Sequence, residues 1–104
     1  MTGAEKVLYD NRFMLNDIEL CLGQEELLAQ LAEECGELTQ AALKMRRVLT
    51  GKNMTPVSWE KASADLNEEM ADVILLIAMA GFDEEKVAEV INRKVKRWYG
   101  RLDL

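Results

Sequence analysis

The sequence predicts an all-α fold, an antiparallel bundle of about four helices assembled as a homo-oligomer. Apolar residues recur at steps of three and four along most of the chain, whereas the strict alternation that is typical of strands appears nowhere. The chain contains one Pro and six Gly, too few for a protein rich in turns. With 104 residues it is long enough for one domain, so we treat residues 1–104 as a single unit.

The N-terminal stretch is the least regular of the predicted helices. Residues 4–20 favour a helix, but their apolar positions are only weakly periodic, and we expect a break near Asn16. These apolar positions are Val7, Leu8, Phe13, Leu15 and Ile18.

A long second helix is predicted from Gln24 to Thr50. One stripe of apolar residues runs along it, and Gly51 ends it after cationic side chains that suit the negative end of the helix dipole. The stripe consists of Leu28, Leu31, Cys35, Leu38, Ala42, Met45 and Leu49. Residues 51–58 have the composition of a loop, because Pro56 cannot lie inside a helix and Ser58 is a good N-cap.

The third predicted helix, from Trp59 to Ala80, is expected at the centre of the fold. Its stripe consists of Trp59, Ala62, Leu66, Met70, Val73, Ile77 and Ala80. Residues 73–80 carry no polar side chain, and a helix that is apolar on every side must be surrounded. A unit of this size has too little interior to surround it alone, so we expect a homodimer or a dimer of dimers.

A fourth helix is predicted after Gly81. Asp83 can cap it, and Glu84 and Glu85 in its first turn suit the positive end of the helix dipole. Its apolar stripe consists of Val87, Val90, Ile91, Val95 and Trp98.

Composition and charge exclude several classes of function. With 13 basic and 19 acidic residues the net charge is −6, which disfavours a nucleic-acid duplex or an anionic membrane surface as a partner. Histidine is absent, which removes histidine-based acid–base catalysis and nearly all zinc sites. The longest apolar run, residues 73–81, is about half as long as a bilayer span, and residues 1–10 lack the apolar core of a signal peptide. We therefore expect a cytoplasmic protein without a membrane partner.

Two pairs of acidic residues border the apolar stripes of the long helices. Glu34 and Glu37 are three residues apart in one helix, as are Glu69 and Asp72 in the other, so each pair lies on adjacent turns of one face. Glutamates on helices are usually solvated, but two such pairs on neighbouring helices can converge. Converging carboxylates repel one another unless cations neutralise them, and oxygen ligands alone select Mg²⁺, Mn²⁺ or Ca²⁺. Magnesium is the expected cofactor, with Mn²⁺ as the alternative.

Nine of the thirteen basic residues lie in two short segments. They are Lys44, Arg46, Arg47 and Lys52, then Arg93, Lys94, Lys96, Arg97 and Arg101. Cations favour the C-terminal ends of helices, which is one explanation. The other is that one or two of them reach the metal site and bind phosphate oxygens, as a Mg²⁺-bound polyphosphate would require.

The two acidic motifs together resemble a known family. Residues 31–38 read Leu-Ala-Glu-Glu-Cys-Gly-Glu-Leu, and residues 69–72 read Glu-Met-Ala-Asp before an apolar helix. This pattern is similar to the E-E-x-x-E and E-x-x-D signature of the MazG-like nucleotide pyrophosphohydrolases, which belong to the all-α NTP pyrophosphatase superfamily, over residues 24–101. The related phosphoribosyl-ATP pyrophosphohydrolases and dimeric dUTPases share this fold. The residues of the first motif, Glu-Glu-Cys-Gly-Glu-Leu, and the short chain favour the MazG-like branch.

The resemblance implies an activity and roles for particular residues. The expected reaction is Mg²⁺-dependent hydrolysis of the α–β phosphoanhydride of an NTP or dNTP, which gives the monophosphate and pyrophosphate. The metal ligands would be Glu34, Glu37, Glu69 and Asp72. Glu33, the first acid of the motif, would be the catalytic residue that orients or activates the attacking water.

The last predicted helix and the aromatic residues complete the comparison with the family. The pattern Ile91-Asn-Arg-Lys94-x-x-Arg97 is similar to a phosphate-binding segment, so Lys94 and Arg97 are the candidate phosphate ligands. An aromatic residue that stacks on the base often precedes the first motif, but here residues 21–24 read Cys-Leu-Gly-Gln. Trp59 and Trp98 could replace it, although both lie on apolar stripes, which favours the core.

Two other classes of function stay open on sequence grounds. One is a catalytically silent relative that binds nucleotides, and the presence of all four expected metal ligands disfavours it. The other is a structural helical interaction protein whose acids are merely solvated. A rise in melting temperature with Mg²⁺ would exclude the second class, because only a folded-state site links metal binding to stability.

Overall fold

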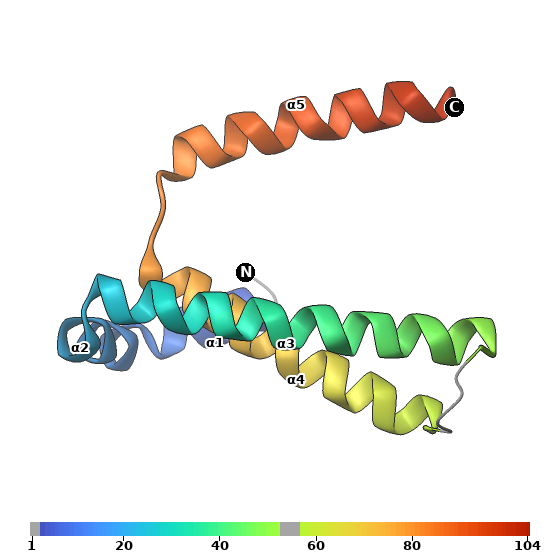
Figure 1. Cartoon of the computed structure of the whole chain (residues 1–104). Helices are drawn as coiled ribbons and strands as arrows, with labels where there is room; N and C mark the ends of the chain where they lie inside the picture. Colours follow the sequence, from blue (N-terminus) through green and yellow to red (C-terminus); the bar gives the residue numbers. More distant parts are fainter. Residues whose placement is uncertain (1–2, 53–56) are drawn as a thin grey trace.

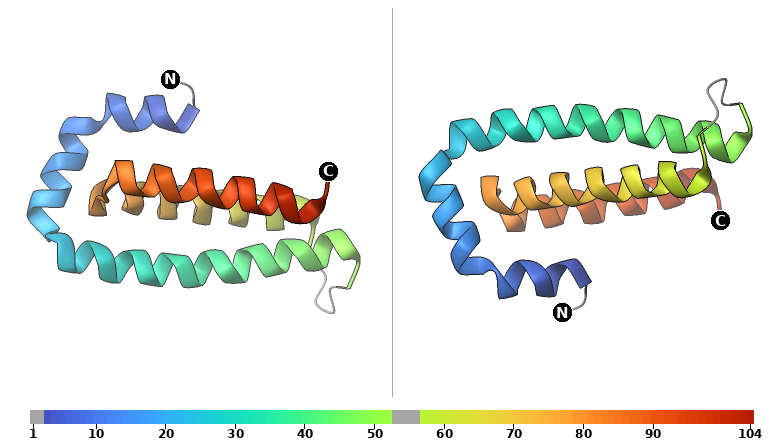
Figure 2. Two further views of the ribbon diagram at one scale, coloured as in Figure 1. Left: turned by 90° about the horizontal axis from the view of Figure 1, so that it is seen from above. Right: turned by 90° about the horizontal axis from the view of Figure 1, so that it is seen from below.

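The computed structural model describes residues 3–52 and 57–104, and within these ranges every regular element is a helix. The helices are α1 (Gly3–Asp10), α2 (Arg12–Leu22), α3 (Gln24–Thr50), α4 (Trp59–Ala80) and α5 (Glu84–Leu102) (Figure 1). α3 and α4 form an antiparallel hairpin, and α1 and α2 curve around the end where α3 begins and α4 ends (Figure 2). The predicted all-α class is confirmed.

Local capping signals place the helix ends where the sequence predicts them. Gly51 ends α3 in the left-handed conformation, with φ 70°, which a glycine adopts without strain. The Ser58 hydroxyl accepts a hydrogen bond from the Lys61 amide at 3.1 Å and caps α4. The Asp83 carboxylate does the same for the Lys86 amide at 3.1 Å at the start of α5. The predicted bounds of α3 and α4 and the predicted start of α5 are confirmed.

The prediction for the N-terminal stretch is partly wrong. The helix breaks at Asn11 rather than near Asn16, which divides it into α1 and α2 and gives five helices instead of about four. The Asn11 side-chain amide donates a hydrogen bond to the carbonyl of Val7 at 2.8 Å. The same carbonyl also accepts the Asn11 backbone N–H at 3.1 Å, so both amides of Asn11 bond to the last turn of α1 where the chain turns. Pro56, in the predicted loop, lies outside the described residues.

The contact between α3 and α4 follows a different stripe from the predicted one. The buried and half-buried residues of α3 that follow a heptad pattern are Leu27, Leu31, Glu34, Leu38, Ala41, Met45 and Val48. The corresponding residues of α4 are Ala62, Leu66, Glu69, Val73, Leu76 and Ala80. We call these two rows the seam. The predicted stripes were wrong at six exposed positions, each of which is replaced in the seam by the residue before it, so that Glu34 and Glu69 take the places of Cys35 and Met70. These positions are Leu28, Cys35, Ala42 and Leu49 of α3 and Met70 and Ile77 of α4.

The apolar core is small and lies at one end of the hairpin. Its buried members are Leu27, Leu76, Met79 and Ala80, with Leu15 and Leu31 packed against them. The Gln24 side chain joins the two helices there, since its amide donates to the carbonyl of Ala80 at 3.4 Å. Farther along the seam, Ala41 and Ala62 are buried small residues that allow the helices to approach closely.

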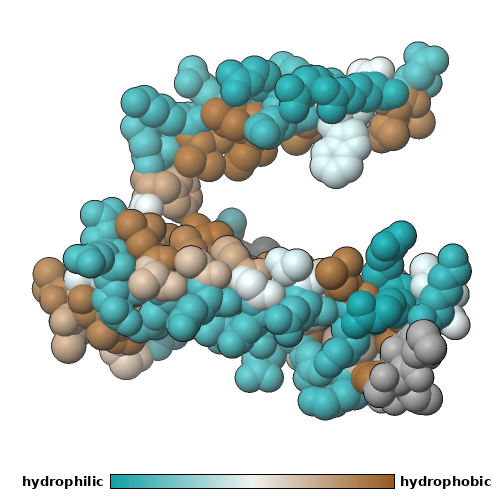
Figure 3. All heavy atoms as spheres, in the orientation of Figure 1, coloured by the Kyte–Doolittle hydropathy of each residue, from teal (hydrophilic) through white to brown (hydrophobic). Residues whose placement is uncertain are grey.

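α5 lies apart from the hairpin, so within one chain it does not pack into the predicted antiparallel bundle (Figure 1). None of its residues is buried. The space-filling view in Figure 3 shows its apolar side turned toward the hairpin across open space. Trp98 on α5 is 69% exposed and Trp59 on α4 is 52% exposed. The expectation that these two side chains belong to the core is therefore wrong for a single chain.

A second apolar face of α4 also stays uncovered. Ile74, Leu75 and Ile77 are each about two-fifths exposed, although the neighbouring Val73 and Leu76 are buried. Residues 73–80 are thus surrounded on one side only. No helix in the described ranges is long and apolar enough to cross a membrane.

The seam predicts which leucines carry the stability of the chain. Leu27→Ala should lower the free energy of unfolding by about 2–5 kcal/mol, because Leu27 is fully buried and its loss leaves a cavity. Leu20→Ala on α2, where the side chain is 76% exposed, should change it by less than about 0.5 kcal/mol. Urea unfolding followed by circular dichroism measures both values. Equal costs for the two variants would contradict the core assignment.

Candidate metal centre

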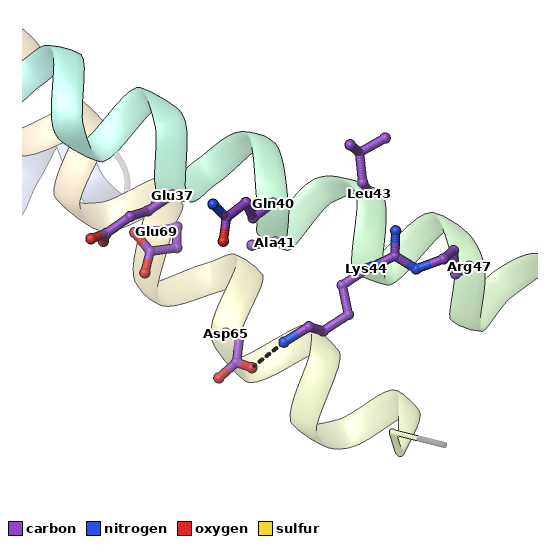
Figure 4. Close-up of a pocket in the computed structure, with 8 residues that line it drawn as sticks. All are labelled: Glu37, Gln40, Ala41, Leu43, Lys44, Arg47, Asp65 and Glu69. Atoms are coloured by element: carbon purple, nitrogen blue, oxygen red, sulfur yellow. Dashed lines mark ion pairs between the residues drawn. The ribbon is translucent and has the colours of Figure 1, made fainter. Parts of the chain in front are cut away.

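Three carboxylates lie close together at the point where acidic residues replace apolar ones in the seam. Glu34 and Glu37 of α3 and Glu69 of α4 each offer one oxygen, and these three oxygens lie within 4.8 Å of one another. Glu34 and Glu69 reach this point because they occupy seam positions, and Glu37 follows Glu34 by one turn of α3. Figure 4 shows the carboxylates of Glu37 and Glu69, from the two helices, lying side by side.

Two of these oxygens are buried without a partner. Oε2 of Glu34 and Oε2 of Glu69 have almost no solvent contact and accept no hydrogen bond from any residue in the described ranges. Most buried polar atoms in proteins are hydrogen-bonded, because the alternative is costly. A cation between the carboxylates would satisfy both atoms and neutralise the charge. An all-oxygen donor set of this kind fits a hard divalent cation such as Mg²⁺.

The ionisation of the cluster reflects the crowding of charge. Burial, together with the neighbouring carboxylates of Glu37 and Asp72, raises the pKa of Glu34 from its ordinary value of 4.5 to about 7. Burial also raises the pKa of Glu69, and repulsion by Glu37 adds to this shift. Without a cation, Glu34 is therefore partly protonated near neutral pH.

The two other acids of the predicted site lie at the edge of the cluster. Asp72 is half-buried one turn after Glu69, and its charge raises the pKa values of both Glu34 and Glu69. Its oxygens are not among those that lie within 4.8 Å of one another. Glu33 is exposed on α3, one turn before Glu37. The structure thus brings together three of the four predicted metal ligands and leaves the fourth close to them.

The predicted phosphate ligands lie elsewhere. Lys94 and Arg97 are exposed residues of α5, the helix that is set apart from the hairpin (Figure 1). They do not line the pocket that borders the carboxylates. Within one chain, the structure does not bring these cations to the acidic cluster.

A pocket of about 470 Å³ runs from the cluster along one flank of the seam. It is lined by Glu37, Gln40, Ala41, Leu43, Lys44, Arg47, Asp65 and Glu69 (Figure 4). Sequence reasoning included Lys44 and Arg47 in a basic segment but did not single out Gln40 or Asp65. Their spacing was the available signal, because Asp65 lies four residues before Glu69 and Gln40 three after Glu37, on the same helix faces.

The metal-free protein should lose stability as the pH rises from about 4.5 to about 7. Folded Glu34 keeps its proton over this window whereas unfolded Glu34 loses it, so the folded state binds more protons and is favoured at the lower pH. Glu34→Gln cannot ionise and should flatten the slope, and Glu33→Gln should keep it. Melting temperatures in the presence of a chelator measure the effect. A slope that is unchanged in Glu34→Gln would contradict the assignment.

Comparison with known proteins agrees with the geometry. The family model of the MazG nucleotide pyrophosphohydrolase domain matches residues 22–99, which include both acidic motifs. No curated protein and no solved structure gave a match. Nucleotide pyrophosphohydrolases of this family generally use a divalent metal, which suits the group formed by Glu34, Glu37 and Glu69. The chain therefore belongs to the MazG nucleotide pyrophosphohydrolase family.

Proposed function

We propose that the protein is a Mg²⁺-dependent pyrophosphohydrolase that cleaves the α–β phosphoanhydride of an NTP or dNTP. The products would be the nucleoside monophosphate and pyrophosphate. One observation carries the proposal: three carboxylates converge in the seam, and two of their oxygens are buried without a hydrogen-bond partner among the described residues. Family membership supports the reaction class.

Four acids would hold the metal, for which Mn²⁺ is the alternative to Mg²⁺. Glu34, Glu37 and Glu69 supply the converging oxygens, and Asp72 would complete the set from the adjacent turn of α4. When bound, Mg²⁺ neutralises phosphate charge and stabilises the negative charge that develops during phosphoryl transfer. The helices contribute a fixed arrangement of ligands, because Glu34 and Glu69 lie between well-packed turns of the seam.

Glu33 is proposed to orient the attacking water and accept its proton. It is exposed and lies on the same side of α3 as Glu37, so its carboxylate can face a water molecule at the edge of the cluster. The water oxygen bonds to the α-phosphorus, and the bond from that phosphorus to the α–β bridging oxygen breaks. Pyrophosphate leaves with the bridging oxygen, and the proton passes from water to Glu33.

We further propose that the working unit is a homodimer or a dimer of dimers. One chain leaves the apolar stripe of α5 exposed together with Ile74, Leu75 and Ile77 of α4. Burying each side chain of this size is worth about 1.5–3 kcal/mol, so leaving them in water is costly for a small domain. The hairpin of a second copy, inserted between α5 and the hairpin of the first chain, would cover both the apolar stripe of α5 and the exposed face of α4.

This assembly would also give Lys94 and Arg97 a place at the site. Lys94 is seven residues after Val87 and four before Trp98, so it lies within the apolar stripe of α5. Covering the stripe would bury this cation, which is costly unless the cation meets a negative group. The acidic cluster of a second copy, with a bound nucleotide, is such a group. α5 carries six basic and three acidic residues, so its charge is complementary to the rest of the acidic chain.

Removing one converging carboxylate should abolish both metal binding and hydrolysis. Wild-type protein should gain about 2.7 kcal/mol of stability at a Mg²⁺ concentration 100 times the Kd, and Glu37→Gln should lose this gain. Pyrophosphate release should fall more than about 100-fold, since even the hydrogen-bond partners of metal ligands are worth about 10–100-fold. Thermal melts and a pyrophosphate assay with the common NTPs and dNTPs measure the two effects.

Glu68→Gln is the matched control, because Glu68 is an exposed acid next to Glu69 that takes no part in the cluster. It should behave like the wild type. Normal turnover in Glu37→Gln would refute the metal assignment. Mg²⁺ stabilisation without hydrolysis of any nucleotide would indicate instead a silent nucleotide-binding relative.

A mixing experiment tests the shared site. Glu37→Gln and Arg97→Gln should each be inactive, but a mixed dimer would contain one site with both residues intact. Mixing equal amounts after dissociation should therefore recover about a quarter of wild-type activity, since half of the dimers are mixed and each has one working site. Sedimentation checks the oligomeric state. An active wild-type monomer, or no recovery on mixing, would contradict the proposal.

A further inference from the structure

The pocket beside the carboxylates carries charges of opposite sign at its two ends. Glu37 and Glu69 lie at one end, and Lys44 and Arg47 lie toward the other (Figure 4). Its volume of about 470 Å³ falls in the range of small-molecule sites. A ligand that fills it must suit both a metal held by acids and a pair of cations.

Helix geometry places the cations in line with the carboxylates. Glu37, Gln40, Lys44 and Arg47 follow one another at steps of three and four on α3, and therefore share one face. Lys44 is seven residues after Glu37, which is about 10 Å along the helix axis. The flexible side chains of Lys44 and Arg47 can reach back over the intervening turn. The other lining residues of the pocket are Gln40, Ala41 and Leu43 of α3 and Asp65 of α4.

Lys44 lies near an acidic side chain, Asp65, but forms no hydrogen bond with it. Asp65 of α4 bonds tightly to Lys61, with an Nζ–Oδ1 distance of 2.7 Å. The Lys44 ammonium lies 4.0 Å from the other oxygen of Asp65, which is too long for a hydrogen bond, and its side chain is 40% exposed. Lys44 can therefore direct its N–H groups to an anion in the pocket without breaking a hydrogen bond seen in the described ranges.

We propose that Lys44 and Arg47 form a subsite for the terminal phosphates of the nucleotide. The pyrophosphate half would lie along α3 between the acidic cluster and this cation pair, and the nucleoside would point away from it. The inference rests on the proposed function and deepens it. Phosphate oxygens are charged and gain strongly from Lys and Arg, whereas a neutral nucleoside gains little. Unlike Lys94 and Arg97, both cations belong to the same chain as the acids beside them.

The test compares the two products as ligands of the full-length protein. Calorimetry in the presence of Mg²⁺ would measure the Kd of inorganic pyrophosphate and of a nucleoside monophosphate. Lys44→Met and Arg47→Met should each weaken pyrophosphate binding about tenfold and change monophosphate binding less than about twofold. Lys44→Arg, which keeps the charge, should restore most of the affinity.

Arg46→Met is the matched control. Arg46 is the neighbour of Arg47 on α3, and its loss removes the same charge, but it does not line this pocket. Its effect on pyrophosphate binding should stay within about twofold. Both cations lie on an exposed flank, so the helix content by circular dichroism should not change. If either methionine variant fails to fold, the glutamine variant at the same position replaces it.

Several results would overturn the inference. These are an unchanged Kd for pyrophosphate in Lys44→Met and Arg47→Met, an equal effect of Arg46→Met, a selective loss of monophosphate binding, or no pyrophosphate binding by the wild type. The proposed function fails by a different result, namely normal metal binding and turnover in Glu37→Gln. Hydrolysis that depends on Glu37 together with unchanged pyrophosphate affinity would reject the subsite alone.

Discussion

The packing of α3 against α4 is constrained by two carboxylates that occupy seam positions. Glu34 and Glu69 lie where the heptad pattern places an apolar residue on every neighbouring turn, and Glu37 adds a third carboxylate beside them. Burial and repulsion by Glu37 and Asp72 raise the pKa values of Glu34 and Glu69, so the ionised cluster is electrostatically unfavourable. A bound cation would remove that cost and turn the weakest part of the seam into a link between the helices.

The placement of this cluster explains how so small a chain can hold a fixed site. Apolar residues around Leu27 and Leu76 close the seam at one end, and Ala41 and Ala62 allow close approach at the other. The acids lie between these two packed regions, so their backbone positions are set by contacts on both sides. Because the core is small, the stability of the hairpin and the occupancy of the site are expected to depend on each other.

The long helix α3 organises charge as well as packing. The acids of the cluster lie near its middle, and Lys44 and Arg47 lie toward its C-terminal end, where the helix dipole favours cations. The pocket along the flank of the seam therefore passes from negative to positive charge without any residue from outside the hairpin. α5 presents a second set of cations, which a single chain does not bring to this pocket.

Local signals in the sequence were sufficient to predict the all-α class, the ends of α3 and α4 and the start of α5. Caps such as Ser58 and Gly51 act within one turn, so their effect can be predicted without knowledge of the rest of the chain. The acidic motifs likewise indicated a metal centre through their residue types and spacing. The seam register could not be predicted in this way, because an apolar pattern selects Cys35 and Met70 rather than the carboxylates beside them. Which acids converge, and whether Lys94 and Arg97 approach them, was decided only by tertiary structure, since these residues lie on separate helices whose relative placement depends on packing.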